Sequence, residues 1–157
     1  MRRSCVIGLG NPDRGDDGLG HAALRLLAGT VAADITLLQR NAAGPGLLDD
    51  WRDFDKVILV DAAAGPNPGQ IHRLEATSPG LPMPLAPGST HGLGLAETLA
   101  LAKALGRLPP QLVIYAMEGA DYSFGAALSP AVAAAMPRLA VRLRAQLRVQ
   151  SPVPAGT

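Results

Sequence analysis

Runs of apolar residues, separated by polar and turn-forming residues, divide the chain into short strands and amphipathic helices. Short continuous apolar runs are typical of strands buried on both faces, whereas apolar residues three or four apart are typical of helices. Strands are predicted over 4–9, 35–38, 57–60, 71–74 and 112–117, and helices from residue 16, over 46–51, over 92–105 and over 130–148. Ser129 should cap the last helix, with Pro130 at its first position, and Pro137 should kink or split it.

Strands that alternate with helices predict a mainly parallel sheet that is covered on both faces. We therefore expect an α/β fold, a three-layer αβα sandwich of the phosphorylase/hydrolase-like kind with a sheet of about five strands. The 71–74 strand should lie at an edge, antiparallel to its predecessor. Residues 1–150 are expected to form a single domain and 151–157 a flexible tail. The proline-rich segment 76–89 is predicted to be a long irregular loop of the kind that is often functional.

Composition and charge exclude several classes of function. Aromatic residues make up only 3% of the 157 residues, so a platform for stacking bases is not expected. The net charge of +1 argues against a nucleic acid or a membrane surface as partner. Cys5 is the single cysteine and lies in an apolar run, which favours a small core residue over a nucleophile. No segment has the length of a membrane span or a signal-peptide core, so we expect a cytoplasmic protein.

Three polar residues lie at points where a predicted strand or loop ends and the next element begins. Asp17 follows the loop after the first strand, Asp61 directly follows the 57–60 strand, and His91 begins a helix after the proline-rich loop. Ligands bind at the carboxyl ends of strands in such sheets, and two carboxylates with one imidazole can hold a divalent transition metal. Taken singly, Asp17 or His91 could cap a helix, and Asp61 could form a turn. Taken together, the three groups favour a site.

Several motifs, in the right order, resemble those of the hydrogenase maturation endopeptidases. That family opens with G-x-G-N, four variable residues and then D-D/E-G-x-G. The matching stretches are 8–20 (GLGNPDRGDDGLG), 57–62 (VILVDA), 89–95 (STHGLGL), Glu118–Gly119 and 125–130 (GAALSP). The likeness spans roughly residues 6–144. Residues 39–44 (QRNAAG) depart from the D-G-G-T-like segment of many relatives, which leaves the target hydrogenase open.

The resemblance implies an endopeptidase that removes the C-terminal extension of a nickel–iron hydrogenase large-subunit precursor after nickel insertion. It also implies that Asp17, Asp61 and His91 contact the metal, which is nickel supplied by the precursor, with zinc or cadmium able to take its place. Attack by water then needs a base or a Lewis acid, so either Asp16 or Asp17 is the general base or a metal activates the water. Asn11 could donate to a developing oxyanion, or it could only form an Asn–Pro turn.

Three alternatives stay open. Peptidyl-tRNA hydrolase also opens with G-L-G-N-P, and His21 lies ten residues after Asn11 as its catalytic histidine does, but that family's T-R-H-N reads LGHA here. A dinucleotide-binding module would need glycine where Asp13 stands, and an acid there would repel a pyrophosphate. A non-catalytic nickel-binding maturation chaperone would share the three proposed ligands. A serine hydrolase is not expected, because the chain has no G-x-S-x-G.

Overall fold

The computed structural model describes residues 3–76 and 94–149, in which five strands form one sheet of order β2-β1-β3-β5-β4. The strands are β1 (Ser4–Leu9), β2 (Thr36–Arg40), β3 (Lys56–Ala63), β4 (Ile71–Glu75) and β5 (Gln111–Glu118). The helices are α1 (Leu19–Leu27), α2 (Gly46–Asp50), α3 (Leu95–Ala104) and α4 (Pro130–Arg148), with a 3-10 turn, η1 (Gly15–Gly18), before α1. Strands β2, β1, β3 and β5 are parallel, and the edge strand β4 runs antiparallel to β5. The mainly parallel sheet is confirmed, although β4 pairs with β5 rather than with its predecessor in the chain.

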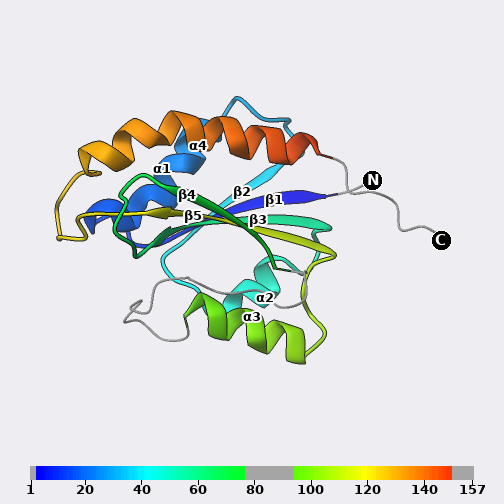
Figure 1. The fold of residues 1–157 in the computed structure, drawn as a ribbon. Coiled ribbons are helices and arrows are strands. Elements are labelled where there is room, and N and C mark those ends of the chain that lie inside the picture. The colour runs from blue at the N-terminus through cyan, green and yellow to red at the C-terminus, as the bar shows by residue number, and fades with distance from the viewer. Residues whose placement is uncertain (1–2, 77–93, 150–157) are drawn as a thin grey trace.

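Helices cover the sheet on both faces, α1 and α4 on one and α2 and α3 on the other (Figure 1). Alternate residues of each strand serve the two layers. In β3, Ile58 and Val60 pack in the core beneath α1 and α4, whereas Val57 and Leu59 pack in the core beneath α2 and α3. Both faces of the strand need apolar side chains, which is why the sequence shows continuous apolar runs. The predicted three-layer αβα sandwich is confirmed.

Close packing of α1 on the sheet fixes the position of the loop that precedes it. A Cβ atom at Gly20 would lie 2.7 Å from the backbone oxygens of both Leu9 and Val60, so only glycine permits this approach. The first turn of α1 therefore lies directly on the ends of β1 and β3. This contact places η1, with its two aspartates, at the carboxyl ends of these strands.

Helix α4 continues through Pro137, so of the two predicted effects, a kink or a split, the split is wrong. Pro137 and Ala133 are both exposed, so the carbonyl that loses its helical partner can bind water instead. Ser129 is at the N-cap position and Pro130 at the first helical position, as predicted, but the Ser129 side chain makes no capping hydrogen bond and donates to Asp16 instead. At the other end, the buried Lys56 ammonium donates to the carbonyl of Gln146 and, at 2.7 Å, to that of Val149. A cation there stabilises the negative end of the helix.

Two predicted features lie outside the described residues. These are the 151–157 tail and nearly all of the proline-rich loop, together with His91. None of the helices in the described ranges combines the length and the apolar composition that a membrane-spanning helix needs.

Candidate functional site

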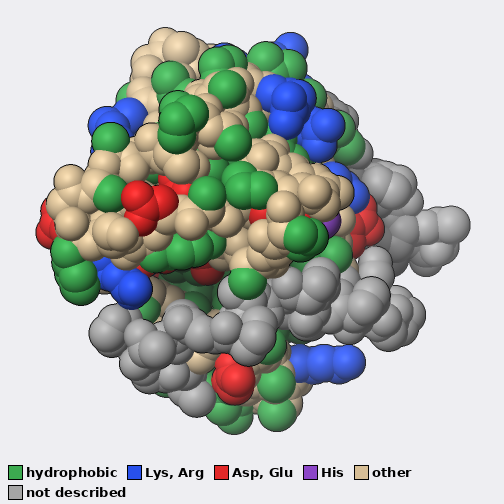
Figure 2. Space-filling view, turned by 60° about the vertical axis from the view of Figure 1, so that its left-hand side comes forward, with side chains coloured by type: hydrophobic (Ala, Val, Ile, Leu, Met, Phe, Trp, Pro, Cys, Tyr) green, Lys and Arg blue, Asp and Glu red, His purple; other side chains and the backbone are tan. Residues whose placement is uncertain are grey.

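The carboxyl ends of β1, β3 and β5 meet at one edge of the sheet, on the left of Figure 1. Residues 10–18 follow β1 there, and residues 119–129 follow β5. Figure 2 brings this edge forward and shows acidic side chains among hydrophobic ones, with most of the Lys and Arg side chains toward the margins of the view. The edge is thus the place where acidic groups from distant parts of the chain come together.

The loop before η1 holds the Asp17 carboxylate from one side only. The backbone N–H of Asn11 donates to Asp17 Oδ2 at 2.8 Å. Gly10 has a φ of 120° and lies against the backbone oxygen of Asp17, where a Cβ would collide. The side-chain oxygen of Asn11 accepts the N–H of Asp13 at 2.9 Å, which closes an Asx turn. Among the described residues Asp17 Oδ1 has no hydrogen-bond partner, so this oxygen can still bind a ligand.

Asp61 lies within β3, not after it, and the pKa of its carboxyl group is close to neutral pH. Burial is the main reason why its pKa rises from 3.8 to about 7, and the charge of Asp17 raises the pKa further. The N–H of Ala62 donates to Oδ1 at 2.8 Å and acts in the opposite direction. The two carboxylates are therefore close enough in space to repel each other, although they lie far apart in the sequence. A cation between them would remove this repulsion and favour the ionised form of both groups. We call Asp17 and Asp61 the acid pair.

Asp16, the neighbour of Asp17, has no exposed surface and faces another segment. Its carboxylate accepts the backbone N–H groups of Ala120, Asp121 and Ser129 at 2.7, 3.0 and 2.7 Å, and the Ser129 hydroxyl at 2.7 Å. Burial would raise the pKa of Asp16, but these donors outweigh it and lower the pKa. Four donors match the roughly four acceptor positions of a carboxylate, so none is left for a substrate. Asp16 instead ties η1 to the 119–129 segment.

Three residues near the edge were not predicted as site residues, although Glu118 lies in a stretch that matches a family motif. Tyr122 donates its hydroxyl to the Ala63 carbonyl at 3.0 Å, and its pKa is raised by burial and by the charges of Asp16 and the acid pair. Glu118 ends β5, where it accepts the Asn67 N–H at 3.0 Å and pairs with His72 Nε2 at 2.8 Å. These two hydrogen bonds lower the pKa of Glu118. A carboxylate at a strand end was a usable signal for Glu118, whereas nothing in the pattern pointed to Tyr122 or His72.

The third proposed ligand, His91, lies outside the described residues. Within the described ranges, no cluster of three or more His, Cys, Asp or Glu side chains is arranged to hold a metal ion. The structure thus brings together the two acids of the predicted set, and the complete three-residue site stays a prediction.

Two other candidates from the sequence belong to the core. His21 is buried in α1, with Nε2 at 3.2 Å from the Arg40 carbonyl, as expected for a helix residue with a satisfied side chain. Cys5 is buried in β1, and burial is the main cause that raises the pKa of its thiol to about 12. Neither residue is placed to act on a substrate at the acidic edge.

The chain is similar to known proteins over most of its length. A family model described as hydrogenase maturation protease matches residues 26–146. The hydrogenase expression/formation protein HupD from Thiocapsa roseopersicina is 30% identical over 131 residues, which cover 81% of this chain but only 59% of that protein. The chain therefore spans less than two thirds of the length of this curated relative.

Solved structures support the same fold. The hydrogenase maturating endopeptidase HybD from E. coli is 24% identical with a TM-score of 0.74, and the match covers 94% of this chain and 93% of that one. The hydrogenase maturation protease HycI from Thermococcus kodakarensis is 22% identical with a TM-score of 0.69, at coverages of 94% and 93%. The matching family model, which covers most of the chain, decides the assignment: this chain belongs to the hydrogenase maturation protease family.

Proposed function

We propose that the chain is an endopeptidase that removes the C-terminal extension of a nickel–iron hydrogenase large-subunit precursor after nickel has been inserted. The observation that supports this most directly is the acid pair. Two carboxylates from distant segments repel each other at the carboxyl edge of the sheet, in a chain of this family. We place the reaction in the cytoplasm, with the precursor as the partner.

The acid pair supports recognition of the nickel that the precursor carries. Carboxylate oxygens and an imidazole nitrogen suit a divalent first-row metal, and a cation relieves the repulsion that raises the pKa of Asp61. The nickel is part of the substrate in this account. His91 would supply the nitrogen. Helix α3 begins at Leu95, the fourth residue after His91. Four residues span at most about 14 Å, so His91 must lie within about that distance of the start of α3.

Two routes to hydrolysis are compatible with the acid pair. In the first, one carboxylate takes the proton from the attacking water, and a pKa near the working pH, such as that of Asp61, suits a general base. In the second, the nickel of the precursor polarises the carbonyl or activates the water. Asp16 takes part in neither route, because its acceptor positions are already used. We infer that it positions Asp17 through η1.

Cleavage of nickel-loaded and nickel-free precursor tests the proposal. Wild type and an Asp13→Ala control, altered at an exposed acid of the same loop, should cut the loaded precursor and leave the nickel-free one intact. Asp17→Ala, Asp61→Ala and His91→Ala should lose this activity. Full activity in all three variants would contradict the site, and equal cleavage of both precursors would contradict recognition of nickel. Binding of the loaded precursor without any cleavage by the wild type would identify a maturation chaperone instead.

A further inference from the structure

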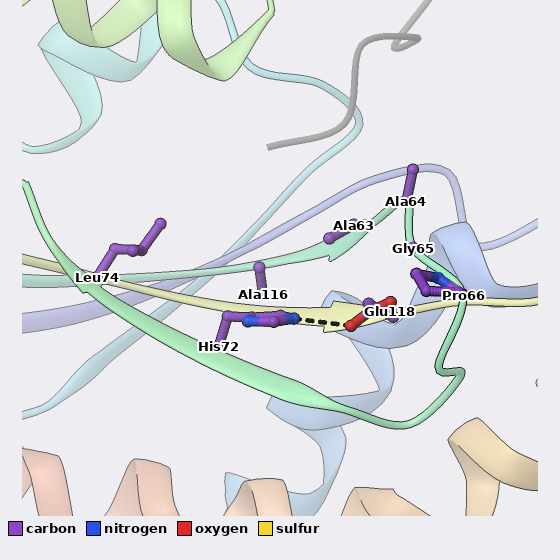
Figure 3. A pocket seen from close by; sticks show the side chains of 8 residues that line it. All are labelled: Ala63, Ala64, Gly65, Pro66, His72, Leu74, Ala116 and Glu118. Atoms are coloured by element: carbon purple, nitrogen blue, oxygen red, sulfur yellow. Dashed lines mark hydrogen bonds and ion pairs between the residues drawn. The ribbon is translucent and has the colours of Figure 1, made fainter. Parts of the chain in front are cut away.

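A cavity of about 160 Å³ lies at the carboxyl edge of the sheet, between the end of β3 and the strands β4 and β5 (Figure 3). We call it the β4–β5 pocket. Its walls are mostly small apolar side chains, and the paired side chains of His72 and Glu118 form its polar end. The apolar part of the lining includes Ala63, Ala64, Pro66, Leu74 and Ala116.

The register of the sheet places this pocket next to Asp61 of the acid pair. Ala116 of β5 lies opposite Asp61 of β3 on one side and opposite His72 of β4 on the other. Residues that lie opposite each other in register share one face of a sheet, so the three side chains form a row on the α2 and α3 face. Neighbouring strands are about 4.8 Å apart, which places Ala116 one strand from Asp61 and His72 about 10 Å from it.

The polar end of the pocket holds one carboxylate, Glu118, which is fixed in place by its hydrogen bonds and paired with His72. Glu118 is held by the Asn67 N–H and by His72, and both contacts lower its pKa, so it is ionised at neutral pH. Gly65 packs so closely on Glu118 that a Cβ atom there would collide with the carboxylate. A fixed anion next to apolar walls admits an uncharged group more readily than an acidic one.

We propose that the β4–β5 pocket is a subsite for an uncharged aliphatic side chain of the precursor, close to the bond that is cut. This inference rests on the proposed peptidase function. The volume resembles that of an apolar protein cavity of about 150 Å³ that takes up benzene, so a branched aliphatic side chain fits. An extended peptide advances about 3.3 Å per residue, so a residue within about three positions of the bond at the acid pair reaches the pocket.

Size complementation between enzyme and precursor tests the subsite. Ala116→Leu should fill the pocket and lower kcat/KM for the nickel-loaded precursor by about tenfold or more. Glycine is then placed, one position at a time, at the three residues on either side of the cleaved bond. One of these precursors should restore the rate of Ala116→Leu to that of wild type. Ala133→Leu, on the exposed side of α4, is the matched control and should cut every precursor as wild type does.

A second variant covers the case that Ala116→Leu does not fold, and an acidic residue in the precursor tests the selectivity for uncharged side chains. If circular dichroism shows that Ala116→Leu is unfolded, Ala64→Leu obstructs the same pocket from an exposed position. Aspartate at the identified precursor position should slow the wild type by about tenfold, and Glu118→Gln should reduce that penalty. An equal loss on all glycine precursors, or no loss with aspartate, would overturn the subsite. A wild type that fails to cut the unaltered precursor would overturn the peptidase proposal itself.

Discussion

Asp16 and Asp61 lie at the same edge of the sheet but in opposite surroundings. Four hydrogen-bond donors surround the Asp16 carboxylate, and its pKa is lowered although the group has no exposed surface. Among the described residues, a single backbone N–H donates to the Asp61 carboxylate, and burial with the charge of Asp17 raises its pKa to about 7. Burial acts to raise the pKa of both carboxylates, and the hydrogen-bond donors reverse this effect only at Asp16.

This contrast separates two roles for acidic residues at the edge: Asp16 stabilises the fold, and the acid pair is available to bind a ligand. The protein itself stabilises the negative charge of Asp16, which joins η1 to the 119–129 segment. It leaves the negative charge of Asp61 poorly stabilised, next to a second carboxylate, so that a cation or a proton has a favourable place to bind. We expect mutations on the Asp16 side to act on folding and mutations on the acid pair to act on cleavage.

The largest effect should follow from breaking the acid pair. Asp17→Asn and Asp61→Asn should each lower the cleavage rate of nickel-loaded precursor by about 10³-fold, because each removes a charged oxygen ligand or base. The double variant should be little worse than either single one, because the two groups act as a unit. Single-turnover cleavage, with Asp53→Asn as an exposed control, measures this. Losses that multiply in the double variant would show that the two carboxylates act separately.

The next largest effect should be on stability, at Asp16. Asp16→Ala removes the buried acceptor of three backbone N–H groups and one hydroxyl, and should lower the free energy of unfolding by about 3 kcal/mol. Asp17→Ala loses one hydrogen bond and should cost less than about 1 kcal/mol. Urea denaturation of both variants makes the comparison. Equal destabilisation would mean that Asp17, like Asp16, holds the fold together.

A smaller effect concerns how stability depends on pH in the metal-free protein. Because the pKa of Asp61 is higher in the folded state than the usual 3.8, the folded state binds an extra proton between about pH 4 and pH 7. Wild type should therefore lose stability as the pH rises through this range, and Asp61→Asn should not. Relative to wild type, the variant should gain roughly 4 kcal/mol between pH 4 and pH 8, at about 1.4 kcal/mol for each unit by which the pKa is raised. A constant difference across the range would contradict the raised pKa.

The smallest effect should come from Asn11. Its side-chain oxygen already accepts the Asp13 N–H, so we expect it to shape the turn that presents its backbone N–H to Asp17. Asn11→Ser keeps an acceptor for this turn and should slow cleavage by less than about tenfold. Steady-state cleavage rates of wild type and Asn11→Ser on the nickel-loaded precursor measure this effect. A loss of 10²-fold or more would identify the Asn11 amide as a donor to the oxyanion.

Local patterns predicted most elements but not their contacts. The first strand, Ser4–Leu9, has the predicted bounds, because both faces of its apolar run are buried. The apolar run over 57–60 predicted only part of β3, which extends from Lys56 to Ala63, because hydrogen bonds to β5 continue past the apolar residues. Pro137 was expected to kink or split α4, but the helix is not split, because the proline lies on its exposed side.

The sequence predicted where in the fold the site lies, but not how its side chains are arranged. Strand ends and the family motifs pointed to Asp17 and Asp61 at the carboxyl edge. They could not separate Asp16 from Asp17, because the donors to Asp16 come from Ala120, Asp121 and Ser129, more than a hundred residues away. The β4–β5 pocket was likewise hidden, since it depends on a register that brings β4 beside β5.

Anomalous X-ray diffraction from crystals soaked with Ni²⁺ or Cd²⁺ tests the central claim most directly. The account predicts one ion that is bound by carboxylate oxygens of both Asp17 and Asp61, at about 2.0–2.3 Å for Ni²⁺ and slightly more for the larger Cd²⁺, with His91 as a further ligand. It also predicts no ion on Asp16. An ion bound to Asp16, or an acid pair that leaves the soaked metal unbound while its side chains point apart, would contradict it.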